Sequence, residues 1–150
     1  MKIIKLKRNI KYIAMHCTAS KPEATLEELR TMWKEERGWK HPGYHYLIDR
    51  EGEVLQLQHE KDIANGVKGY NTECIHIAYI GGVDKENKPM DNRNPAQMEA
   101  LFFKIVELAE KYPNAEIKGH RDFPDVHKDC PCFDVKKFVE EYVPNISKAA

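Results

Sequence analysis

The stretch CIHIAYI at residues 74–80, followed by Gly81 and Gly82, is the most apolar run of this 150-residue chain. A short apolar run that ends at turn residues is typical of a buried strand in the middle of a sheet. A second strand is predicted over NIKYIAMH at residues 9–16, because apolar residues dominate it and turn-prone residues follow it. We therefore expect a sheet with residues 74–80 at its centre.

Three helices are predicted from the spacing of apolar residues and from their caps. The first covers residues 25–37, where Thr25 and Glu28 have the spacing of a capping box. The second covers residues 95–112 and begins with a proline, and the third covers residues 135–142.

Short strands at residues 44–49, 53–57 and 115–119 complete the pattern. Strands that alternate with helices indicate an α/β fold with helices on the faces of the sheet. We expect a single domain over residues 1–150, with a central mixed β-sheet that about three helices flank. The functional site is expected in a surface groove at the strand ends, where open α/β sheets place their ligands.

The composition argues against several classes of partner. The 24 basic and 24 acidic side chains cancel, so no overall field favours nucleic acid or an anionic membrane. No stretch approaches the ~20 apolar residues of a membrane span. Residues 1–12 carry five basic side chains and no acid; we expect a solvated arm, with contact to an anionic polymer such as a bacterial wall as the alternative.

The four cysteines are too few for a disulfide framework in a chain of this size. Cys17 and Cys74 lie in predicted strands among apolar residues, so we expect both to be small core residues. Cys130 and Cys132 instead lie in a polar segment that begins at His120.

Two histidines and one of the cysteines in this polar segment have the chemistry of a catalytic zinc site. Side chains alternate along a strand, so Tyr12, Ala14 and His16 share one face of the predicted strand, while Cys17 lies on the other. His120 also ends a strand. Two imidazoles and one thiolate can bind zinc and leave its fourth position open, but spacing alone permits either Cys130 or Cys132 as the sulfur ligand. Taken alone, this pattern is weak, since a strand-end histidine is more often structural.

A second polar group surrounds the start of the strand at residues 44–49. We expect Tyr44 and Tyr46 to face one way and His45 the other. The tyrosines either cover the core or place one phenol beside the metal, where its O–H could hydrogen-bond a developing oxyanion. Lys128 could act in the same way as a cation.

Taken together, these residues resemble the zinc-dependent N-acetylmuramoyl-L-alanine amidases, which share their fold with peptidoglycan recognition proteins. The likeness is strongest to small bacteriophage amidase-type lysozymes and covers almost the whole chain. The motifs that carry it are MHCTAS (15–20), WKHPGYHYLI (39–48), DREG (49–52), KGYN (68–71), YIGG (79–82), NPAQM (94–98) and KDCPCFD (128–134).

The resemblance implies one Zn²⁺ ion bound by His16, His120 and Cys130, with Tyr44 as a catalytic tyrosine and Lys128 as a transition-state-stabilising lysine. It implies hydrolysis of the amide between N-acetylmuramic acid and the L-alanine of the peptidoglycan stem peptide. Peptidoglycan is then the partner, and we expect a monomer.

No signal peptide is recognisable. We therefore expect synthesis in the cytoplasm and action on the wall after export or after release at lysis.

Three alternatives stay open from the sequence. The groove could bind peptidoglycan without cutting it, or a cytosolic amidase could recycle anhydro-muropeptides. A regulatory protein could instead use zinc as a closed four-ligand structural site that includes Cys132.

Two positions depart from the family pattern: a thiol, Cys132, stands where a small residue is usual. Gly66 stands where a histidine often precedes the KGYN segment.

Overall fold

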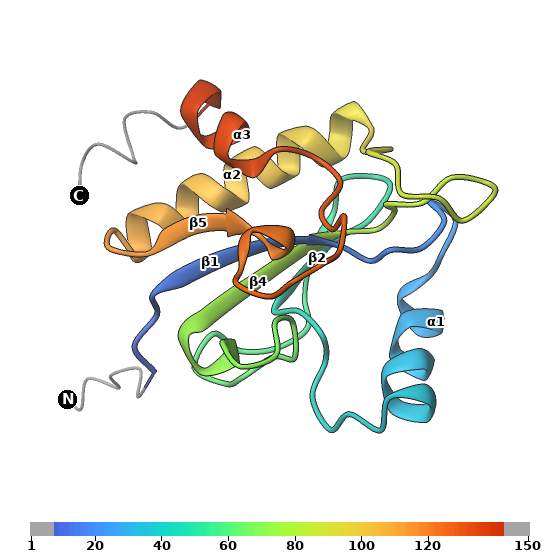
Figure 1. The fold of residues 1–150 in the computed structure, drawn as a ribbon, viewed down its shortest axis with the longest axis horizontal. Coiled ribbons are helices and arrows are strands. Elements are labelled where there is room, and N and C mark those ends of the chain that lie inside the picture. The colour runs from blue at the N-terminus through green and yellow to red at the C-terminus, as the bar shows by residue number, and fades with distance from the viewer. Residues whose placement is uncertain (1–7, 143–150) are drawn as a thin grey trace.

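The computed structural model describes residues 8–142, which form one five-stranded sheet with helices around it (Figure 1). The strand order is β3-β2-β4-β1-β5. Neighbouring strands run parallel except β2 and β3, which form an antiparallel hairpin. The predicted mixed sheet is therefore confirmed, with the apolar run as its central strand. The strands are β1 (Tyr12–Cys17), β2 (Tyr46–Ile48), β3 (Val54–Gln56), β4 (Cys74–Tyr79) and β5 (Glu116–Gly119).

The three predicted helices are present. They are α1 (Leu26–Thr31), α2 (Pro95–Lys111) and α3 (Val135–Tyr142). The predicted capping box of α1 forms, because the Glu28 backbone N–H donates to Thr25 and the Glu28 carboxylate accepts from the Thr25 backbone. The remainder of the predicted first helix, Met32–Glu36, winds as a π-helical turn that continues α1.

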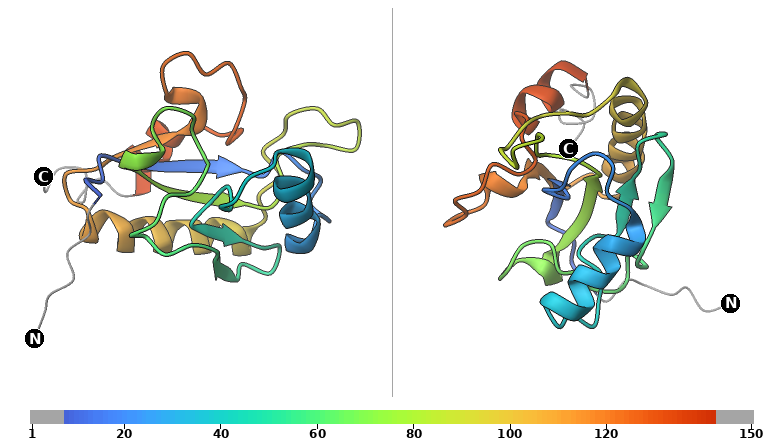
Figure 2. Two further views of the ribbon diagram at one scale, coloured as in Figure 1. Left: turned by 90° about the horizontal axis from the view of Figure 1, so that it is seen from below. Right: turned by 90° about the vertical axis from the view of Figure 1, so that its right-hand side faces the viewer.

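The sheet has two chemically different faces. Ile13, Met15 and Cys17 of β1 belong to the large apolar core shared with α2 and α3. Ala14 packs with Val67 of the loop over residues 58–73 in a separate cluster on the opposite face of the sheet from α2 (Figure 2). The predicted alternation along β1 is therefore confirmed, and Cys17 and Cys74 are buried as predicted.

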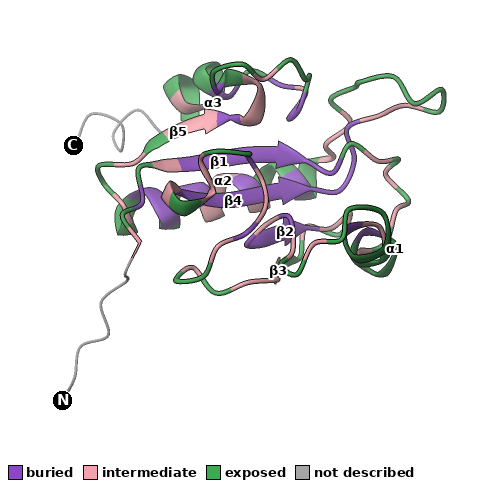
Figure 3. Cartoon of the chain, turned by 60° about the horizontal axis from the view of Figure 1, so that its bottom comes forward, coloured by how far each residue is buried: buried purple, intermediate pink, exposed green. Residues whose placement is uncertain are grey.

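The two central strands are buried on both faces along nearly their whole length. Every residue of β4 is buried, as are five of the six residues of β1 (Figure 3). His16 is 1% exposed and His76 is 0% exposed. Because buried polar groups require hydrogen-bonding partners, the face opposite α2 must contain an internal polar network.

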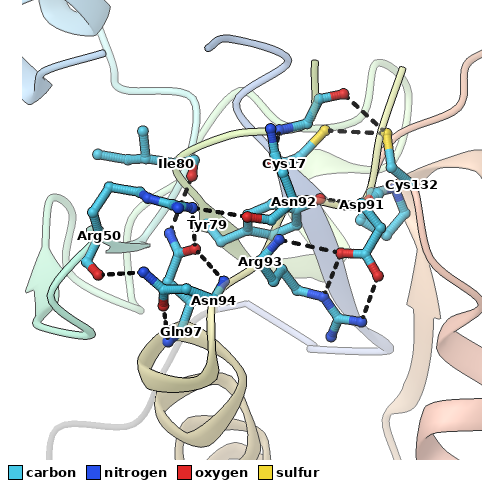
Figure 4. A network of polar contacts seen from close by, with 12 residues as sticks. Cys17, Arg50, Tyr79, Ile80, Asp91, Asn92, Arg93, Asn94, Gln97 and Cys132 are labelled. Atoms are coloured by element: carbon cyan, nitrogen blue, oxygen red, sulfur yellow. Dashed lines mark hydrogen bonds and ion pairs between the residues drawn. The ribbon is translucent and has the colours of Figure 1, made fainter. Parts of the chain in front are cut away.

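A group of side chains fixes the segment that follows β4 to the start of α2 (Figure 4). Arg50 Nη1 donates to the Asn92 carbonyl at 2.9 Å and to Gln97 Oε1 at 2.8 Å. Gln97 Nε2 donates to the Ile80 carbonyl at 3.0 Å. The fully buried Gln97 thus joins α2 to the carboxyl end of the central strand.

The predicted basic arm lies mostly outside the described residues. Arg8 is the first described residue, and contrary to the prediction its side chain is bound to the protein rather than solvated. Its guanidinium donates to the carbonyls of Glu60 at 2.5 Å, Asp62 at 2.8 Å and Asn71 at 2.9 Å. Arg8 therefore ties the chain before β1 to the loop over residues 58–73. Between residues 8 and 142, no helix is long and apolar enough to cross a membrane.

Candidate metal centre

His16, His120 and Cys130 come together at the carboxyl ends of β1 and β5. One ligand atom from each lies within 4.8 Å of the others. His16 is near the end of β1, and His120 begins the 3₁₀ turn that follows β5. Within residues 8–142 this is the one group of His, Cys, Asp and Glu side chains with such spacing.

Backbone hydrogen bonds position Cys130. The Arg121 N–H donates to the Cys130 carbonyl at 2.9 Å, and the Cys17 N–H donates to Cys130 Sγ at 3.2 Å. The phenol of Tyr79 donates to the Pro131 carbonyl at 2.7 Å. The loop after β5 is therefore fixed to the ends of both central strands, and Cys130 Sγ lies 3.9 Å from His16 Nδ1.

Cys132 points away from this group. Its Sγ lies 3.9 Å from Cys17 Sγ and 3.4 Å from the Gly82 carbonyl (Figure 4). Burial and the neighbouring Cys17 raise the pKa of the Cys132 thiol to about 12. Of the two cysteines that the sequence permitted, the geometry brings Cys130 alone beside the histidines.

Tyr44 and Tyr46 do not share a face, so that part of the sequence prediction is wrong. The regular strand begins only at Tyr46, and the bend before it turns Tyr44 toward His16, with ring centroids 5.1 Å apart. Tyr46 lies on the α2 side, where its phenol donates to Glu60. The Tyr44 phenol donates to the Cys17 carbonyl at 3.1 Å.

A pocket of about 110 Å³ opens above the three candidate ligands. Lys128 lines it from the exposed loop before Cys130, and Trp33, Arg37 and Trp39 line it from the α1 side. Given that one water takes ~30 Å³ in the liquid, the pocket has room for a water and an amide group. A larger apolar groove lies between α2 and α3, but it has no such ligand group.

The electrostatics of the site favour neutral imidazoles. Burial lowers the pKa of His16 well below its ordinary value, and the neighbouring histidines and Lys128 lower it further. Burial and Lys128 lower the pKa of His120 to about 4. Neutral imidazole is the form that binds a metal ion. Burial also raises the pKa of Tyr44 well above its ordinary value, with the sulfur of Cys130 contributing, so its phenol keeps its proton at neutral pH.

One buried residue beside His16 was not predicted from the sequence. His76 of β4 lies on the same face as His16, and its Nδ1 is 2.9 Å from His16 Nε2. Its signal was the single imidazole inside the most apolar run of the chain, since polar groups so deeply buried are rare unless paired.

The chain is similar to a known family and to several known proteins. Residues 6–133 match the family model described as N-acetylmuramoyl-L-alanine amidase. The endolysin of Klebsiella phage KP32 is 37% identical over 131 residues, which cover 86% of this chain and 85% of that protein.

Two solved structures have the same fold. The Ph2119 endolysin from Thermus scotoductus MAT2119 bacteriophage Ph2119 is 26% identical, with a TM-score of 0.75 and coverage of 93% of this chain and 88% of that one. Drosophila PGRP-LB is 18% identical, with a TM-score of 0.72 and coverage of 95% and 86%. At such low identity, the second likeness concerns the fold alone.

Proposed function

This chain belongs to the N-acetylmuramoyl-L-alanine amidase family, and on that premise we propose that it cleaves peptidoglycan with one zinc ion bound by His16, His120 and Cys130. The scissile bond is the amide between N-acetylmuramic acid and the L-alanine of the stem peptide. The observation that carries the proposal is the approach of these three ligand atoms to within 4.8 Å beneath an open pocket.

The donor set fits zinc. Zinc prefers imidazole nitrogen and thiolate sulfur, and catalytic zinc sites supply three protein ligands and leave one position open. No fourth His, Cys, Asp or Glu of the described residues joins the group. When bound, zinc would lower the pKa of a water molecule toward ~7 and polarise the amide carbonyl.

Tyr44 and Lys128 are the proposed catalytic side chains. The phenol of Tyr44 keeps its proton at neutral pH and is a hydrogen-bond donor beside His16. To reach an oxyanion, it would exchange the Cys17 carbonyl for the substrate oxygen. Lys128 lies on the exposed rim of the same pocket and would supply a positive charge. Such donors stabilise the charge that develops on the amide oxygen in the transition state.

We further propose that the enzyme is a monomer and acts on the host wall after release at lysis. The similar protein of Klebsiella phage KP32 is an endolysin, and the family match covers most of this chain. Size-exclusion chromatography with light scattering tests the oligomeric state.

The two cysteines provide a matched test of the site. Wild type, Cys130→Ser and Cys132→Ser are compared for bound zinc and for free stem peptide released from purified sacculi, measured by mass spectrometry with and without a chelator. We expect Cys130→Ser to lose zinc and nearly all peptide release, and Cys132→Ser to keep both.

Each alternative predicts a different result. Full zinc and full activity in Cys130→Ser would refute the ligand set. Loss of zinc in Cys132→Ser would indicate the closed structural site. Bound peptidoglycan without peptide release by the zinc-loaded wild type would indicate a binding module. Cleavage of soluble anhydro-muropeptides but not of sacculi would indicate a recycling enzyme.

A further inference from the structure

We propose that His76 is a positioning residue for the metal site, which holds His16 in the tautomer whose Nδ1 lone pair faces Cys130 and His120. The inference rests on the ligand set proposed above and concerns the residue behind it. It is carried by a chain of hydrogen bonds whose direction the structure fixes at every step.

The chain begins at Asn71, whose side-chain oxygen is identified by two backbone donors. The N–H groups of Gly66 and Val67 donate to Asn71 Oδ1 at 3.1 Å and 2.8 Å. The same oxygen lies 2.9 Å from His76 Nε2. Because a carbonyl oxygen can only accept, the proton of the His76 ring must be on Nε2.

The tautomer of His76 then determines that of His16. With its proton on Nε2, neutral His76 presents a lone pair at Nδ1, which lies 2.9 Å from His16 Nε2. His16 must therefore donate from Nε2, and its Nδ1 carries the lone pair. That nitrogen lies 3.9 Å from Cys130 Sγ, on the side where the metal ligands converge.

His76 is itself held from both sides. Its backbone N–H donates to His45 Nδ1 at 3.0 Å, and the His45 N–H donates to the His76 carbonyl at 3.0 Å. The two rings stack with an interplanar angle of 14°. On the other side lies Gly66, where an added Cβ would be 2.3 Å from His76 Nδ1.

The absence of a side chain at Gly66 therefore leaves room for the imidazole of His76. A Cβ at 2.3 Å from a ring atom overlaps it, so a side chain at position 66 would displace His76 from His16. The unusual glycine noted in the sequence has a physical reason in this chain, because the ring of His76 occupies the place next to it.

Partners that orient metal-binding histidines typically change metal affinity by about 10–100-fold when they are removed. His76→Leu replaces the imidazole with an apolar side chain of similar volume and so removes the acceptor. His76→Asn is the matched control, because asparagine Oδ1 lies at the same distance along the side chain as histidine Nδ1. Zinc affinity is measured by competition with a chromophoric chelator, and circular dichroism monitors the fold.

We expect the zinc dissociation constant to rise about 10–100-fold in His76→Leu and to stay within about threefold of wild type in His76→Asn. The Co²⁺-substituted proteins should show the same order, with an altered d–d absorption spectrum in His76→Leu. Unchanged zinc affinity in a folded His76→Leu protein would overturn the proposal.

A second measurement needs no variant and no metal. Long-range ¹H–¹⁵N correlation spectra of the metal-free wild-type protein report which ring nitrogen of His16 is protonated. We expect the proton on Nε2, and a proton on Nδ1 would overturn the inference even if His76→Leu fails to fold. Because this measurement is independent of the Cys130 result, failure of the ligand set and failure of the His76 proposal are distinguishable.

Discussion

Replacing His45 with glutamine should make the stability of the protein less sensitive to acid. His45 is fully buried, and burial lowers its pKa from an ordinary 6.5 to about 4, with the Arg8 guanidinium contributing. Both ring nitrogens are engaged in the neutral form. Nε2 lies 2.8 Å from the Asp62 carbonyl and therefore donates, while Nδ1 accepts from the His76 N–H. A second proton would have to be placed on Nδ1, against that N–H.

The sign and size of the effect follow from linkage. Above pH 6.5 His45 is neutral in both folded and unfolded chains, so it does not affect the pH dependence. As the pH falls from 6.5 toward 4, the unfolded chain takes up a proton that the folded chain does not, and stability is lost. Each pKa unit corresponds to about 1.4 kcal/mol, which gives a limit of roughly 3 kcal/mol. About 2.5 kcal/mol of this should be lost between pH 7.5 and pH 4.5.

The assay is urea unfolding at pH 7.5 and pH 4.5, with a chelator present throughout so that metal release does not contribute. Wild type should lose about 2.5 kcal/mol more than His45→Gln over this interval, because glutamine does not titrate. His59→Gln is the control, since His59 is exposed, and it should follow wild type. An equal loss in wild type and His45→Gln would refute the reasoning.

Two further substitutions test the site and the fold. Tyr44→Phe should lower kcat about 10²–10³-fold with zinc content unchanged. Tyr46→Phe, on the opposite face of the sheet, is the control and should keep its activity. A fully active Tyr44→Phe protein would remove Tyr44 from the mechanism. Gln97→Leu should lower the free energy of unfolding at pH 7.5 by about 2 kcal/mol, because it leaves the buried Ile80 carbonyl and one Arg50 donor without this partner. A change below about 0.5 kcal/mol in urea unfolding would contradict this role of Gln97.

What the sequence could predict here was local in origin. The two-residue period of a strand is enough to place His16 and Cys17 on opposite faces, and the structure confirms that placement. The same rule failed for Tyr44 and Tyr46, because it holds only where the backbone is extended and β2 begins at Tyr46. The face assigned to a side chain therefore depends on the residue at which the strand begins, and the sequence gives that residue only approximately.

The choice between Cys130 and Cys132 depends on information of another kind. Both residues fit a two-residue period in an extended loop, but Cys132 has a φ of +70°, so the loop is not extended there. Its thiol turns toward Cys17 and Gly82 on the core side. Only the three-dimensional path of the loop shows which of the two sulfurs faces the histidines. In the sequence, the resemblance to the family motif was the one basis for choosing Cys130.

His76 was beyond the reach of local rules for the same reason. It faces His16 because β1 and β4 pair in parallel with Ala14 opposite His76 and His16 opposite Ala78. This register places position 76 diagonally next to position 16 on one face. The loop over residues 58–73, which precedes β4, then brings Gly66 against the same ring. Positions 66 and 76 thus share one volume, so a chain of this fold with a side chain at 66 must give up an imidazole at 76 in this place. In the site proposed here, another donor or acceptor would then have to hold the tautomer of His16.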